Sequence, residues 1–95
     1  MPENAGPQRR EVYYQGIVQG VGFRYAVWSI AFDFAVTGFV QNLPDGRVKL
    51  VAEGEPAELD RFLAAILRQR GPDLDDIQQT AGPATGEFRR FEIRH

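Results

Sequence analysis

The stretch TGFVQNLPDGRVKLVAEG, residues 37–54, decides the fold of this chain. Residues 37–41 form a short apolar segment, and residues 47–53 alternate apolar and polar side chains, as a half-buried strand does. The NLPDG segment between them, residues 42–46, contains Pro-Asp-Gly, which favours a tight turn because proline presets φ and glycine accepts a positive φ. The stretch therefore predicts a β-hairpin in which Asp45 serves the turn.

A helix is predicted on each side of this hairpin. Before the hairpin, residues 23–36 carry apolar side chains at helical spacing, namely Ala26, Val27, Ile30, Ala31 and Phe34. After it, proline at a first helical position and a Gly-Pro stop bound a second helix, which begins at Pro56 and ends before Gly71. The apolar stripe of this second helix consists of Leu59, Phe62, Leu63, Ile66 and Leu67.

Further strands are predicted towards both ends of the chain. Residues 11–18 (EVYYQGIV) are rich in aromatic and β-branched side chains, and residues 88–94 (FRRFEIR) alternate. Residues 73–86 have little pattern, and we expect a short strand around Ile77 followed by a loop at residues 81–86. Residues 1–10 are polar and are expected to form a flexible N-terminal tail before a single domain at residues 11–95.

The order β-α-β-β-α-β predicts an α+β fold of the ferredoxin-like type, an antiparallel sheet with two helices on one face. In this arrangement the first and third strands are central and the second strand pairs with the third. The end of the second strand then lies near the loop that follows the first strand. Because this fold hosts many functions, the activity has to be argued from side chains.

The composition excludes several classes of function. The 95 residues carry a net charge of −2 and include no cysteine. Disulfides, thiolate metal sites and cysteine nucleophiles are therefore excluded, which fits a cytoplasmic protein. His95 is the single histidine and the aspartates lack metal-ligand spacing, so no metal or cofactor is expected. Because the net charge is negative and no long apolar run occurs, we expect neither nucleic-acid nor membrane binding.

The segment GIVQGVGFR, residues 16–24, is the first candidate site. Its glycines allow the backbone to approach a ligand, and a helix that begins beside them points unpaired N–H groups at the same place. Together these features predict a nest of amide donors for an anion, with the Arg24 guanidinium beside it. The nucleotide-binding patterns do not fit, since GxGxxG and the Lys-Ser/Thr end of the P-loop are missing. The alternative is a glycine-rich turn with a solvated arginine.

Asn42 is the second candidate, because it ends the strand before the hairpin turn. Asparagine is common at turns, where its side chain bonds to its own backbone, and this structural role is the alternative. The predicted topology favours a functional role, since it brings the end of this strand near the loop after the first strand.

The paired segments GxVQGVGFR (residues 16–24) and TGFVxNxxDG (residues 37–46) resemble the two signature segments of the acylphosphatases. The resemblance extends over residues 11–95, and it implies the ferredoxin-like fold and the metal-free hydrolysis of small acyl phosphates to a carboxylate and inorganic phosphate. It also implies Asn42 as the residue that holds the attacking water, and a phosphate-binding loop made of Gln19, Gly20, Val21, Gly22, Phe23 and Arg24.

Three positions depart from the pattern of this family. Phe39 stands where tryptophan or tyrosine is usual, Ala35 where glycine often ends the first helix, and His95 where a C-terminal tyrosine is common. None of the three is Arg24 or Asn42, so the departures concern detail rather than the chemistry.

Other functions remain open from the sequence. One is a non-catalytic phosphate-binding or regulatory domain of the same fold. An RNA-recognition domain shares the element order, but here the GFRY segment begins a helix and the net charge is negative. We expect a monomer; the alternative is weak self-association through the second apolar face of the first helix, formed by Tyr25, Trp28, Phe32 and Val36.

Overall fold

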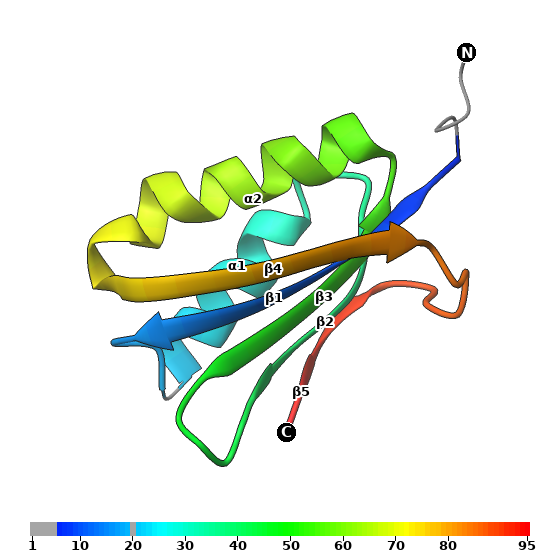
Figure 1. Ribbon diagram of the computed structural model, residues 1–95. Coiled ribbons are helices and arrows are strands. Elements are labelled where there is room, and N and C mark those ends of the chain that lie inside the picture. The colour runs from blue at the N-terminus through cyan, green and yellow to red at the C-terminus, as the bar shows by residue number, and fades with distance from the viewer. Residues whose placement is uncertain (1–5, 20) are drawn as a thin grey trace.

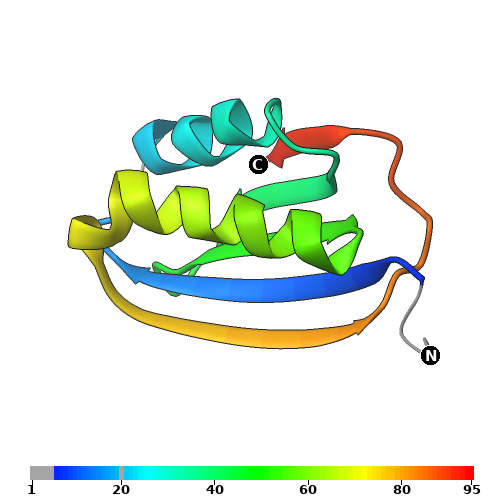
Figure 2. The same cartoon turned by 90° about the horizontal axis from the view of Figure 1, so that it is seen from above.

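The protein is described by a computed structural model, which covers residues 6–19 and 21–95. Its elements are, in order, β1 (Gln8–Gly16), α1 (Val21–Ala31), β2 (Thr37–Asn42), β3 (Val48–Gly54), α2 (Pro56–Arg70), the 3₁₀ turn η1 (Gly71–Asp73), β4 (Leu74–Pro83) and β5 (Phe91–Arg94). The strands form one sheet in the order β4-β1-β3-β2-β5, and both helices lie on one face of it (Figures 1 and 2). The predicted α+β, ferredoxin-like fold is confirmed, with β1 and β3 in the centre.

The sheet is mixed, so the prediction of a wholly antiparallel sheet is wrong at one edge. β5 pairs in parallel with β2, and Val40 lies opposite Ile93. The cause is the place where β4 ends, because Pro83 pairs with Gln8 at the end of the sheet where β2 begins. The chain crosses along that end to the far edge, and it can then only run beside β2 in the same direction (Figure 1).

Several element boundaries differ from those predicted. β1 starts at Gln8, so residues 8–10 belong to the sheet and not to the predicted tail. β4 is ten residues long and includes Ile77 as predicted, but it also takes up part of the loop expected at residues 81–86. Its sequence shows no alternation because it is an edge strand whose side chains are almost all exposed. The last strand starts at Phe91 rather than at residue 88.

The first helix is shorter at its C-terminal end than the expected span of residues 23–36. It ends at Ala31, and the chain tightens into a turn in which Phe34 N donates to Ala31 O over 3.1 Å. Ala35 N then donates to Glu58 Oε2 of α2 over 2.8 Å. A carboxylate of the neighbouring helix therefore binds the chain directly after the turn.

The hydrophobic core lies between the two helices and the sheet. Fully buried side chains come from the strands, as Val12, Val40 and Leu50, and from α2, as Leu59, Phe62 and Ile66. This confirms most of the predicted stripe of the second helix, although Leu67 is 48% exposed. On α1, Val27 and Ile30 are buried as predicted.

The Glu53 side chain binds the segment that crosses from β4 to β5, residues 84–90. The side chain is only 4% exposed, and its carboxylate accepts hydrogen bonds from Thr85 N at 2.9 Å, Thr85 Oγ1 at 2.9 Å and Gly86 N at 3.0 Å. Arg9 Nη1 lies 3.3 Å from the same carboxylate. Burial alone would raise the pKa of Glu53, but these hydrogen bonds outweigh it and lower the pKa below its usual value. The network thereby fixes the approach to β5.

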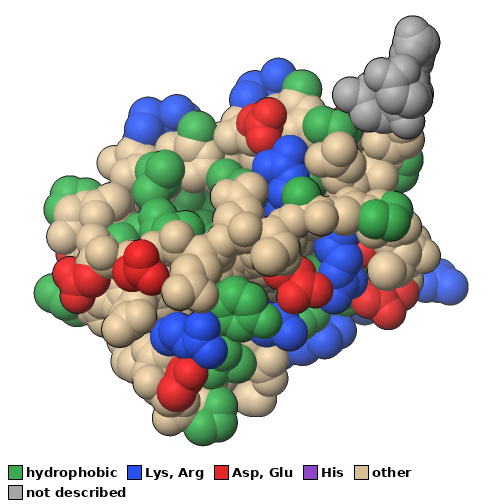
Figure 3. All heavy atoms as spheres, in the orientation of Figure 1, with side chains coloured by type: hydrophobic (Ala, Val, Ile, Leu, Met, Phe, Trp, Pro, Cys, Tyr) green, Lys and Arg blue, Asp and Glu red, His purple; other side chains and the backbone are tan. Residues whose placement is uncertain are grey.

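On the face shown in Figure 3, lysine and arginine side chains are interspersed with aspartate and glutamate, so no single basic patch covers this face. Within the part of the chain that the structure describes, neither helix has the length and apolarity needed to cross a membrane.

Candidate active site

The chain changes direction sharply where β1 ends, at Gly16. This glycine has a φ of +138°, and a Cβ atom at this position would lie 2.3 Å from the Asp73 carbonyl oxygen. Ile17 N donates to the same oxygen over 2.8 Å. Only glycine permits this close approach, which anchors the start of the loop that leads to α1.

Gln19 connects this loop to the turn of the β2–β3 hairpin. Its Nε2 atom donates to Gly46 O over 2.8 Å and lies 3.3 Å from Arg47 O. The hairpin turn is itself closed by Asp45, whose Oδ1 accepts from Arg47 N at 3.1 Å. Hydrogen bonds from the Arg47 backbone and side chain lower the pKa of Asp45, and the predicted turn role of this residue is confirmed. The loop before α1 and the turn after β2 are thus held against each other.

Most of the predicted phosphate-binding loop is the first turn of α1. Val21, Gly22, Phe23 and Arg24 are the first four helical residues, whose N–H groups have no acceptor within the helix. They form the positive end of the helix dipole, which favours an anion. The Phe23 side chain is buried and packs edge-on against Tyr14, with ring centroids 5.3 Å apart, so it anchors this turn in the core. Gly20 lies outside the described residues.

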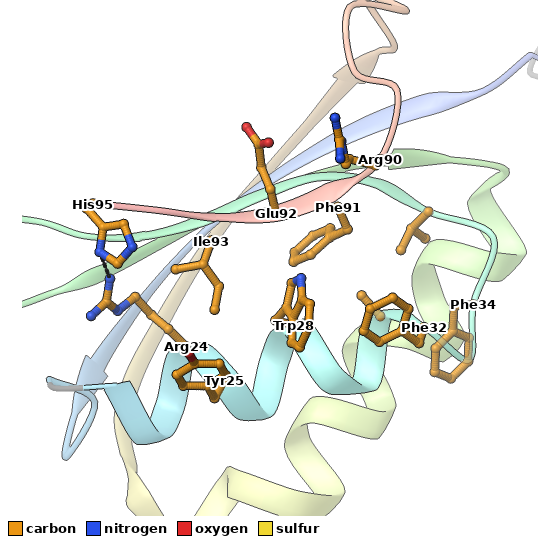
Figure 4. A pocket seen from close by; sticks show the side chains of 12 residues that line it. Arg24, Tyr25, Trp28, Phe32, Phe34, Arg90, Phe91, Glu92, Ile93 and His95 are labelled. Carbon is orange, nitrogen blue, oxygen red and sulfur yellow. Dashed lines mark hydrogen bonds between the residues drawn. The ribbon is translucent and has the colours of Figure 1, made fainter.

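The Arg24 side chain is 8% exposed and points from α1 towards the end of β5. Its Nη1 atom lies 3.1 Å from His95 Nδ1 and 3.4 Å from Arg94 O (Figure 4). Since the guanidinium can only donate, Nδ1 accepts this hydrogen bond, which requires the neutral imidazole with its proton on Nε2. The Nε atom of Arg24 is buried and has no partner.

Asn42 is the last residue of β2 and pairs with Val48 of β3. It lies on the same face of β2 as the buried Val40, since side chains two residues apart in a strand point the same way. This is the face that α1 covers. The Oδ1 atom of Asn42 is buried and has no hydrogen-bond partner.

The two candidates lie at the same end of the sheet, on its helix-covered side. β2 and β5 pair with Gln41 opposite Arg94, and continuing this register by one residue places His95 beside Asn42. His95 in turn contacts Arg24. The Arg24 side chain and the strand position of Asn42 therefore both lie next to His95.

Unpartnered buried polar atoms single out these residues. Within residues 6–19 and 21–95, three buried side-chain nitrogen or oxygen atoms lack a partner, namely Arg10 Nε, Arg24 Nε and Asn42 Oδ1. A buried polar group without a partner costs about 1–3 kcal/mol, and folded proteins contain few of them. Two of the three belong to the residues that the sequence singled out, and they lie at the same end of the sheet.

Sequence reasoning missed two contacts of this site. The contact of His95 with Arg24 depends on the parallel docking of β5, for which a local sequence pattern gives no signal. The bridge from Gln19 to the hairpin turn joins two segments that lie far apart in the sequence. Among the described residues, no three His, Cys, Asp or Glu side chains are grouped to hold a metal ion.

Comparison with known proteins gives one consistent result. Residues 10–93 match the family model described as Acylphosphatase. An acylphosphatase of Archaeoglobus fulgidus is 47% identical over 87 residues, which cover 90% of this chain and 96% of the relative. An acylphosphatase of Methylococcus capsulatus is 42% identical over 91 residues and covers 90% of this chain and 95% of its own length.

Solved structures give the same result. The crystal structure of acylphosphatase from Bacillus subtilis matches with a TM-score of 0.82 and 34% identity, over 93% of this chain and 99% of that chain. A structure of full-length HypF in a phosphate- and nucleotide-bound form matches with a TM-score of 0.80 and 30% identity, over 96% of this chain but only 12% of that chain. The same fold therefore also occurs as a small part of a much longer protein.

Proposed function

Since this chain belongs to the acylphosphatase family and hydrolyses acyl phosphates, we propose that Arg24 holds the phosphate group and Asn42 aims the attacking water. The observation that carries this proposal is the pair of unpartnered buried atoms. Arg24 Nε is a donor and needs an acceptor such as a phosphate oxygen, whereas Asn42 Oδ1 is an acceptor and needs a donor such as water. The acyl phosphate supplies the acceptor for Arg24 Nε, and the attacking water supplies the donor for Asn42 Oδ1.

The phosphate is held by Arg24 together with the first-turn amides of α1. His95 engages Nη1 of Arg24 and so leaves the Nε side of the guanidinium available for a phosphate oxygen. The amides of Val21, Gly22 and Phe23 add donors at the positive end of the helix dipole. These donors stabilise the oxygens of the phosphoryl group as charge redistributes over them. We include Gln19 and Gly20 in this loop on the resemblance to the family.

Asn42 acts by orientation. A carboxamide is not a base, but its oxygen accepts one hydrogen of a water molecule and so directs a lone pair of that water at phosphorus. The bond from the water oxygen to phosphorus forms as the bond from phosphorus to the acyl oxygen breaks, and the carboxylate leaves with the bonding electron pair. The proton of the water passes to an oxygen of the phosphate.

This small set of groups is sufficient for an acyl phosphate. The leaving carboxylate is the conjugate base of an acid with a pKa near about 4, so it needs no proton from the protein. Phosphoryl transfer passes through a loose transition state that demands mainly positioning and charge stabilisation. The same site would act poorly on phosphate monoesters, whose alkoxide leaving group requires a general acid.

Hydrolysis of acetyl phosphate and benzoyl phosphate, measured with and without a chelator, tests the proposal. We expect an unchanged rate in the chelator and competitive inhibition by inorganic phosphate, which shares the site with the substrate. Loss of activity in the chelator, restored by a divalent metal, would overturn the metal-free mechanism. Inhibition by phosphate that is not competitive would argue against the shared site.

A further inference from the structure

An apolar groove of about 700 Å³ runs along α1 from the proposed phosphate site. β5 forms its other wall (Figure 4). It is lined on α1 and the following turn by Tyr25, Trp28, Ala31, Phe32, Phe34 and Val36, and at its end by Arg24 and His95. This volume falls within the range of about 300–1,000 Å³ that is usual for small-molecule sites.

The aromatic side chains of the groove hold one another in place. Trp28 packs edge-on against Tyr25 with ring centroids 6.1 Å apart, and against Phe32 at 4.7 Å. Phe32 is 70% exposed and Tyr25 is 54% exposed, so this row of rings keeps a large apolar surface in contact with water. An apolar ligand laid against rings that are already ordered would remove that surface from water at little cost in conformational entropy.

β5 presents an apolar strip to the groove and turns its charges away. Phe91 and Ile93 point towards α1, whereas Glu92 and Arg90 point to the other side of the strand (Figure 4). The charged group that points into the groove is thus the Arg24 guanidinium at one end. The groove therefore suits a ligand with an anionic head and an apolar body.

We propose that this groove binds the acyl group of the substrate, and that the enzyme prefers acyl phosphates with an aromatic or extended apolar acyl group. The inference rests on the proposed role of Arg24. In an acyl phosphate a single bridging oxygen joins phosphorus to the carbonyl carbon. The organic part therefore starts within a few ångströms of the guanidinium, where the groove begins. Acetyl phosphate is too short to reach Trp28 or Phe32 and would leave the groove empty.

Substrate selectivity tests this inference. In wild type we expect a kcat/KM for benzoyl phosphate at least about 10-fold above that for acetyl phosphate. Tyr25→Ala and Trp28→Ala each remove one wall near Arg24 and should lower the kcat/KM for benzoyl phosphate about 10-fold, while that for acetyl phosphate stays within about twofold. Leu67→Ala is the matched control, because Leu67 is an exposed apolar residue of α2 outside the groove, and it should change neither value.

Trp28 also gives a direct binding signal, since it is the single tryptophan of the chain. Benzylphosphonate, which has an anionic head and an aromatic body but cannot be hydrolysed, should change the tryptophan fluorescence of the wild-type protein at saturation. Methylphosphonate, which has the head alone, should not. Tyr25→Ala should weaken the binding of benzylphosphonate about 10-fold and leave the Ki of inorganic phosphate unchanged.

The failure of this inference differs from failure of the proposed function. Equal loss on both substrates in Tyr25→Ala and Trp28→Ala, or no selectivity in wild type, would refute the acyl subsite while the hydrolysis stands. If these variants lose activity on both substrates and also lose the inhibition by phosphate, the phosphate site is affected instead. If sedimentation shows a dimer that Trp28→Ala dissociates with unchanged selectivity, the groove is an interface between two copies, and the inference is wrong.

Discussion

Replacing Asn42 by leucine separates the catalytic role of this side chain from its structural one. Leucine is close to asparagine in size but carries no polar atom, so the variant removes the buried Oδ1 atom without opening a large cavity. We expect the enzyme to lose activity and to keep its stability. A residue that serves only the fold or the turn would lose stability, and activity would fall only as far as the fold suffers.

The expected magnitudes follow from the environment of Oδ1. Asn42 Oδ1 has no partner within the protein, so its removal breaks no hydrogen bond of the fold. The free energy of unfolding should therefore stay within about 0.5 kcal/mol of the wild-type value. For a domain of this size that corresponds to a change in Tm of less than about 4 °C. The loss of one positioning group at the reacting centre should lower kcat about 10²- to 10³-fold, with a much smaller change in KM.

Hydrolysis of benzoyl phosphate, followed by absorbance, gives kcat and KM, and thermal unfolding followed by circular dichroism gives Tm. Gln41→Leu is the matched control, because Gln41 precedes Asn42 on β2 but lies on the opposite face, and its kcat should stay within about twofold of wild type. A kcat of Asn42→Leu near that of wild type would refute the positioning of water by Asn42. A lower Tm would show that the carboxamide stabilises the fold.

Three further predictions concern the phosphate site and the fold around it. Arg24→Ala should lower kcat/KM at least about 10²-fold and raise both KM and the Ki of inorganic phosphate, because in the proposed mechanism Arg24 binds the phosphate in the ground state as well. Glu53→Gln should destabilise the protein by about 1–3 kcal/mol near pH 7, measured by denaturant unfolding, because the amide cannot accept every bond that the carboxylate accepts. The folded-state pKa of Glu53 lies below the usual value of 4.5, so this stability is present above pH 4.5 and should be lost as the pH falls through the folded pKa. Gly38→Ala should destabilise by about 2–4 kcal/mol, since its Cβ would lie 1.9 Å from Val51 O, whereas Gly82→Ala has free space and should have little effect.

Each of these predictions has a contrary result. An unchanged Ki of phosphate in Arg24→Ala would remove the guanidinium from the binding site. A difference in stability between wild type and Glu53→Gln that stays constant from pH 7 down to pH 3 would show that the ionised carboxylate is not what fastens the crossing segment. Equal effects of the two glycine substitutions would show that the close approach of Gly38 to β3 is not what limits that position.

Local patterns determined the elements of this fold because each depends on nearby residues. The PDG turn with an alternating strand after it predicts the hairpin, and the spacing of Leu59, Phe62 and Ile66 predicts the buried face of α2. The length of β4 was underestimated, and the reason is physical. An edge strand with exposed side chains needs no alternation, so its ten residues carry little signal.

The candidate site was indicated by the sequence, but its neighbours were not. Arg24 and Asn42 were singled out by a glycine-rich segment before a helix, by a strand end and by the resemblance to a family. His95 was noted as the single histidine and as a departure from that family, but its contact with Arg24 was not predicted. The sequence indicated the apolar second face of the first helix, but it did not predict that β5 lies opposite this face and closes a groove.

The sequence by itself determined the order of the helices and strands and indicated the two side chains that we propose to carry the chemistry, since turn residues, apolar spacing and residue type act over a few positions. Only the tertiary structure decided that β5 runs parallel to β2. That choice depends on where a long edge strand ends and on a buried carboxylate that binds the crossing segment. It places His95 beside the guanidinium of Arg24 and Phe91 opposite Trp28 (Figure 4), through contacts between segments far apart in the chain that no local pattern encodes.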